Sequence, residues 1–138
     1  AALETMDEDF RVVLVLRGQY AEARRVLEVA LEQLEARSLP QHAAACRVHL
    51  LPALAGIGDW AGVDAHYGLG VAMLLQLDQV DPALGASAQL AGDLAAAAQP
   101  ERARKLYELA LRQFRLLGMS EEIGAVRLRL AQLPYEGE

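Results

Sequence analysis

Residues Gly18–Leu34, with the sequence GQYAEARRVLEVALEQL, carry a pattern that returns twice in the chain at a fixed interval of 40 residues. Gly18 is followed at that interval by Gly58 and then by Ala98. An internal period of this size indicates an array of helical repeats. The other matching sets are Ala23, Val63 and Ala103; Leu27, Tyr67 and Tyr107; Ala30, Gly70 and Ala110; Leu31, Val71 and Leu111; and Leu34, Leu74 and Phe114.

The composition also favours helices. The chain has 138 residues, which is typical of one domain with a sizeable core. It is 54% hydrophobic but only 5% aromatic, because Ala and Leu supply most of the apolar content. Both are strong helix formers, so the predicted fold class is all-α.

Charge and cysteine usage exclude several function classes. The formal net charge of −6 argues against a nucleic-acid partner, which requires a basic face. The single cysteine, Cys46, rules out an internal disulfide framework and fits a reducing compartment. No apolar run has the length of about 20 residues that a membrane span needs, so the expected location is cytoplasmic. Because the sequence opens without Met or a signal-peptide pattern, we expect a piece of a longer protein.

Seven helices are expected, as three helix-turn-helix repeats and a closing helix. Residues 11–16 are rich in Val and could form a strand, but Phe10 and Leu14 precede Leu50 and Leu54 by one period, which favours a helix. Pro52 predicts a kink or an early end of the third helix, and Ser120 is expected to cap the last one. The predicted repeats cover about residues 3–38, 40–78 and 81–118, and the closing helix covers 120–133.

The repeated text resembles the tetratricopeptide (TPR) family, whose second helices read Gly-Asp-Tyr-x-x-Ala with Ala-Leu seven residues on. The resemblance covers nearly the whole chain and implies a right-handed superhelix of helix pairs, although the family's usual repeat is 34 residues, not 40. The longer variety looks like arrays in large bacterial signalling and regulatory proteins. The matching residues are Gly18-Gln19-Tyr20-x-x-Ala23 with Ala30-Leu31, Gly58-Asp59-Trp60 with Gly70-Val71, and Pro100-Glu101-x-Ala103 with Ala110-Leu111.

The resemblance also implies a concave groove lined by the first helix of each pair. Its positions are small and apolar and lack the basic residues that grip a chaperone's terminal carboxylate, so they suit an apolar helix or extended segment of a partner. Alternatively, the small residues there only let helices pack tightly, or flanking parts of the same protein fill the groove. The predicted groove residues are Glu8, Val12, Ala45, Val48, Pro52, Ala88, Gly92, Leu128 and Gln132.

One weak metal candidate stands on the third helix. His42, Cys46 and His49 share a helix face, and with His66 they could hold Zn²⁺. However, Cys46 falls at a repeat position that otherwise holds apolar residues, which favours a packing role. No metal and no cofactor are therefore predicted.

No nucleophile-and-base pattern and no phosphate-binding loop are found in the sequence, so the chain is not expected to be an enzyme. The predicted function is a protein-interaction, scaffold or regulatory module whose partner is a protein, a peptide or a flanking domain. Two alternatives stay open: a sensor for a small apolar ligand, and a homodimer formed through the N-terminal helix around Val13.

Overall fold

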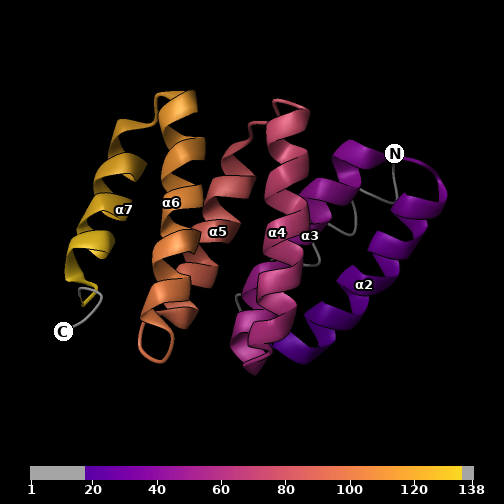
Figure 1. The fold of residues 1–138 in the computed structure, drawn as a ribbon, viewed down its shortest axis with the longest axis horizontal. Helices are drawn as coiled ribbons and strands as arrows, with labels where there is room; N and C mark the ends of the chain where they lie inside the picture. Colours follow the sequence, from indigo (N-terminus) through magenta and orange to yellow (C-terminus); the bar gives the residue numbers. More distant parts are fainter. Residues whose placement is uncertain (1–17, 135–138) are drawn as a thin grey trace. The chain divides into compact units, whose positions relative to one another are not determined.

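The computed structural model describes residues 18–134, and Figure 1 shows their course. These residues form six helices and no strand, which confirms the all-α class. The predicted helix over residues 3–16, and with it Glu8, Val12 and Val13, lies outside the described residues. The helices are α2 (Tyr20–Ala36), α3 (Pro40–Ile57), α4 (Trp60–Gln76), α5 (Pro82–Ala95), α6 (Pro100–Leu117) and α7 (Ser120–Gln132).

The 40-residue period of the sequence is also present in the backbone. Helices α2, α4 and α6 begin at Tyr20, Trp60 and Pro100. Each ends in a left-handed residue, with φ of 55° at Ser38, 50° at Asp78 and 69° at Gly118. The residue that follows donates its backbone N–H to the carbonyl five residues earlier, in the same way at all three ends. This bond closes a helix around a left-handed residue, so the three turns share one construction. The bonds are Leu39 to Leu34, Gln79 to Leu74 and Met119 to Phe114, each 3.0 Å long.

Several helix ends are defined by a capping side chain or by a glycine. Asp59 and Asp81 cap α4 and α5, where their carboxylates accept the N–H groups of Gly62 at 3.0 Å and Ala83 at 2.7 Å. Gly58 ends α3 with a φ of 77°. The prediction that Ser120 caps α7 is wrong, because Ser120 is already the first residue of that helix and no side chain caps it.

Pro52 does not end α3, which continues to Ile57. A proline in a helix interior costs about 3 kcal/mol. This helix is nevertheless held by its surroundings, since Leu50, Leu51 and Leu54 beside the proline are at most 1% exposed. Burial of three leucines contributes more than that cost, at about 2 kcal/mol each.

The described residues divide into two compact units between Gln79 and Val80. In the first unit α3 packs against both α2 and α4, and in the second α6 packs against both α5 and α7 (Figure 1). Each unit is compact by itself, and the predicted superhelix with a continuous groove along it stays a prediction.

In the first unit, the contact between α3 and α4 has its bulky side chain on α3. A methyl group added at Gly70 of α4 would lie 3.6 Å from Val48 Cγ2 and 3.4 Å from Arg47 Cβ. Val48 itself is fully buried. These are ordinary contact distances, so α4 passes Val48 at Gly70 with room for a methyl group.

In the second unit, two aromatic rings of α6 lie against glycines of α5. A methyl group at Gly92 would lie 2.6 Å from Tyr107, and one at Gly85 would lie 2.6 Å from Phe114. The Tyr107 hydroxyl donates a 2.6 Å hydrogen bond to Asp93 of α5, and Arg129 of α7 donates to the same carboxylate at 2.9 Å. Asp93 thus joins all three helices of the unit.

Candidate functional site

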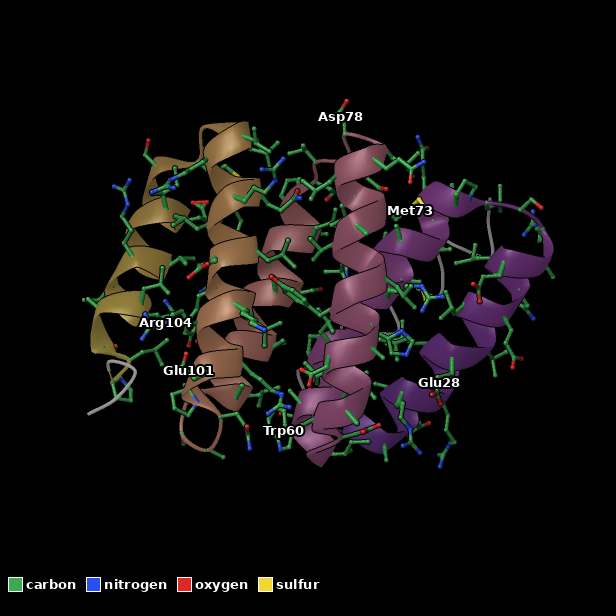
Figure 2. All side chains as sticks on the ribbon, in the orientation of Figure 1. Glu28, Trp60, Met73, Asp78, Glu101 and Arg104 are labelled. Atoms are coloured by element: carbon green, nitrogen blue, oxygen red, sulfur yellow. The ribbon has the colours of Figure 1, made fainter. Side chains whose placement is uncertain are left out.

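A hollow of about 460 Å³ opens on the first unit, where the end of α2, the first turns of α3 and the second half of α4 meet. Met73 of α4, which is labelled in Figure 2, is one of the residues that line this hollow. Most of its lining is apolar, and its polar groups are Glu35, Ser38 and Arg47. The full lining is Glu35, Ser38, Leu39, Pro40, Ala43, Ala44, Arg47, Leu69 and Met73.

The left-handed turn at Ser38 positions one wall of the hollow. It reverses the chain between α2 and α3, so that Leu39 and Pro40 lie at the start of α3. On the other wall, Leu69 of α4 is 57% exposed. An apolar hollow with a few polar groups is a feature of surfaces that bind partners or ligands.

A polar network crosses the same three helices at the edge of the hollow. Arg47 of α3 donates to Glu35 of α2 at 3.0 Å and makes a 3.0 Å hydrogen bond with Nδ1 of His66 on α4. His66 must be neutral to accept this bond. Burial and, after it, the charge of Arg47 lower the pKa of His66 below its usual value of 6.5, against the opposing influence of Glu28, Asp59 and Glu35.

The predicted groove residues of the two units do not form an accessible apolar surface. Val48, Pro52, Ala88 and Gly92 are all buried. Gly92 is covered by Tyr107 of its own unit, and Val48 lies against α4 at Gly70. These four residues are therefore not accessible, as an open groove would require, and at Val48 and Gly92 the next helix of the pair lies against them. The groove along the whole chain stays a prediction.

Three other predicted groove residues keep some exposure. Ala45 on α3 is half-buried. On α7, Gln132 is exposed and Leu128 is 60% exposed. The equivalent residues are therefore more exposed on α7 than on α3 and α5, although the three helices occupy equivalent places in the repeat.

The weak metal candidate is contradicted by the positions of its side chains. Cys46 is buried, and its thiol donates to the backbone carbonyl of Leu27 on α2 at 3.4 Å, whereas His42 is exposed. His66, the suggested fourth ligand, bonds Arg47. Across residues 18–134, no three His, Cys, Asp or Glu side chains gather closely enough to hold a metal ion.

The network around Asp93 also shifts the protonation equilibrium of Tyr107. Burial and the hydrogen bond to Asp93 raise the pKa of Tyr107. Its hydroxyl therefore stays protonated, as the donor role requires.

Comparison of the chain with protein-family models, with curated proteins and with solved structures finds no match. The fold and the candidate site therefore rest on the residues described above, and the TPR resemblance stays a prediction. Within residues 18–134, no helix combines the length and the apolar character that crossing a bilayer demands.

The hollow has no distinct signal in the sequence. Leu69 has Val29 and Leu109 at the equivalent places of the repeat, so the sequence does mark an apolar position. Leu109 is 5% exposed and Leu69 is 57% exposed. The repeat pattern identifies such a position but does not tell whether a neighbouring helix covers it.

Proposed function

We propose that this chain is a non-enzymatic interaction module, and that the hollow on the first unit binds an apolar helical or extended segment of a partner protein. The observation that supports this most directly is the apolar hollow with Leu69 exposed at its edge. A stack of helices offers such depressions where three helices meet, and helix-in-groove binding uses them.

The chemistry of the hollow defines what it would accept. Leu39, Leu69 and Met73 offer apolar contact, and the flexible thioether of Met73 adapts to side chains of different shape. The Arg47–Glu35 pair adds a cation and an anion at the edge. A fitting segment therefore places one or two bulky apolar residues in the hollow and a polar group beside this pair.

Selection of peptides from a random displayed library would test the proposal. The intact chain is used as bait beside two variants, Leu69→Glu in the hollow and Val29→Glu on α2. Val29 is a matched control, because it is 54% exposed, lies one period before Leu69 and does not line the hollow. We expect the parent chain and Val29→Glu to enrich the same peptides, rich in bulky apolar residues, and Leu69→Glu to lose them. Enrichment of the same peptides by Leu69→Glu, or of none by the parent chain, would contradict the proposal.

A second candidate is a sensor for a small apolar ligand, which the volume of the hollow favours. About 460 Å³ lies within the range of roughly 300 to 1,000 Å³ that is usual for small-molecule sites. Native mass spectrometry of protein purified from its source would test it. A retained small mass that Leu69→Glu loses and Val29→Glu keeps would favour the sensor over the peptide-binding module.

A further inference from the structure

Arg47 belongs both to the lining of the hollow and to a link between two of its walls. Its guanidinium bonds Nδ1 of His66 on α4 through Nη1 and Glu35 of α2 through Nη2, each at 3.0 Å. Because the guanidinium is planar and rigid, these two bonds fix its position. This pair of contacts, here named the Arg47 bridge, connects α2 with α4 at the edge of the hollow.

The shape of the hollow depends on the spacing of the two helices that the Arg47 bridge connects. Glu35 and Ser38 line the hollow from the end of α2, and Leu69 and Met73 line it from α4. Both helices pack on α3, whereas α2 and α4 make few contacts with each other. The Arg47 bridge therefore adds a polar link where direct packing between these two walls is sparse.

The Arg47 bridge requires a neutral His66. Arginine carries donors only and keeps its charge at any pH relevant to a protein, so the ring nitrogen has to accept. A protonated imidazole has an N–H group at both nitrogens and cannot accept. It would also place a second positive charge beside the guanidinium, at the present distance of 3.0 Å between the two nitrogens. Protonation of His66 therefore breaks the bridge on the α4 side, while the bond to Glu35 persists.

The charges around His66 come from three helices and oppose one another. Arg47 of α3 disfavours the protonated ring, whereas Glu28 and Glu35 of α2 and Asp59 at the start of α4 favour it. Burial and Arg47 together outweigh the carboxylates, so the pKa of His66 lies below its ordinary value of 6.5. The ring is therefore neutral at pH 7, with the bridge closed, and takes up its proton in acidic solution.

We propose that the contact between Arg47 and His66 is a proton-sensitive switch for the hollow. With His66 neutral, the Arg47 bridge holds α2 and α4 at the spacing that forms the hollow, and protonation of His66 releases α4 and weakens binding there. The inference rests on the proposed function, because it concerns the regulation of the same hollow. It applies to a peptide and to a small molecule alike, since both would use the same walls.

Binding of the dye Nile red to the intact chain at different pH values tests the switch. The dye is uncharged and does not titrate, and its fluorescence rises in apolar surroundings. Binding that Leu69→Glu abolishes and Val29→Glu keeps is assigned to the hollow. Because only the fraction of chains with neutral His66 would bind well, we expect the affinity to fall by about threefold or more between pH 7.5 and pH 5.0. Circular dichroism at each pH checks that the chain stays folded.

Two histidine variants show whether His66 causes the decline. In His66→Gln the amide oxygen can accept from Arg47 at every pH, so this variant should lose most of the pH dependence. His42→Gln is the matched control, because His42 is exposed and does not line the hollow, and it should keep the full decline.

Nuclear magnetic resonance tests the Arg47 bridge itself. In the free chain labelled with nitrogen-15, the guanidinium signals of Arg47 should change with the same pH midpoint as the ring signals of His66. Bound Nile red should move this midpoint to lower pH, because a ligand that prefers the neutral ring must oppose its protonation to the same extent.

The outcomes separate failure of the switch from failure of the hollow. Binding that depends on Leu69 but not on pH, an equal decline in His66→Gln, or guanidinium signals that ignore the titration of His66 would overturn the switch and leave the hollow as a binding site. Absence of any binding that depends on Leu69 would count against the proposed function and the switch together.

Discussion

In the first unit a buried glycine of the helix pair lies on the later helix, whereas in the second unit two such glycines lie on the earlier helix. Val48 of α3 packs at Gly70 of α4, but Gly85 and Gly92 of α5 receive Phe114 and Tyr107 of α6. These contacts lie at different places in the repeat, since Gly70 corresponds to Ala110, and Gly85 and Gly92 correspond to Ala45 and Pro52. Close packing allows the small residue on either helix, since only the combined volume at a contact has to be kept.

The polar links of the two units also differ, in the charge and in the position of the residue that joins the three helices. In the first unit a cation at the centre, Arg47, bonds Glu35 and His66 on the two outer helices. In the second unit an anion on an outer helix, Asp93, bonds Tyr107 and Arg129. Only the first link contains a histidine, so only the first is expected to respond to pH near neutrality.

The largest effect is expected from one substitution made in both units. Gly92→Ala places a methyl group 2.6 Å from Tyr107, whose ring is buried and held by Asp93, so it should lower the free energy of unfolding by about 2 kcal/mol. Gly70→Ala meets its nearest neighbour at 3.4 Å and gains helix propensity, so it should raise the free energy by about 0.5 kcal/mol. Urea unfolding followed by circular dichroism measures both. Changes of the same sign would contradict the difference in space between the two glycine contacts.

A smaller effect is expected from pH, through the first unit alone. Burial and Arg47 lower the pKa of His66 in the folded chain. As the pH falls, His66 therefore binds a proton near pH 6.5 in the unfolded chain and only at lower pH in the folded chain. The free energy of unfolding should therefore fall as the pH drops below about 6.5. His66→Gln should reduce this decline between pH 7 and pH 5, and His42→Gln, at an exposed position, should not. Equal declines in the parent chain and in His66→Gln would exclude this histidine as the cause.

The smallest effect concerns the turns that end α2, α4 and α6. Ser38 and Asp78 adopt the left-handed conformation that Gly118 adopts in the third turn, and Figure 2 shows Asp78 directly after α4. A non-glycine residue is strained there, so Ser38→Gly and Asp78→Gly should each stabilise the chain by about 0.5 kcal/mol. Thermal unfolding measures the change, and Gly118→Ala is the reverse control, which should destabilise. Destabilisation by both glycine variants would show that their side chains support the turns.

Much of the fold could be predicted because its signals are local. The period, the capping aspartates Asp59 and Asp81, and Gly18 and Gly58 with their positive φ are properties of short segments. The early end that Pro52 offered as one of two outcomes does not occur, because the burial of α3 is a property of the whole unit. The left-handed conformation of Ser38 and Asp78 could not be predicted either. Neither residue is glycine, so the residue type gives no sign of the turn.

The candidate surfaces were harder to predict, because exposure depends on which neighbour is present. Val48, Ala88 and Leu128 share one place in the repeat, and the sequence alone assigned all three to one groove. Val48 and Ala88 are buried, and Leu128 is exposed. Periodicity predicts equivalent faces but not whether each face is covered.

The thiol of Cys46 makes the opening of one unit separately measurable. It is the single cysteine of the chain, it is 1% exposed, and it lies in the first unit against α2. A thiol reagent can therefore modify the folded chain only when that region opens, and the labelling rate gives the free energy of opening. Compared with the free energy of global unfolding, this value tells whether the two units open together or one at a time.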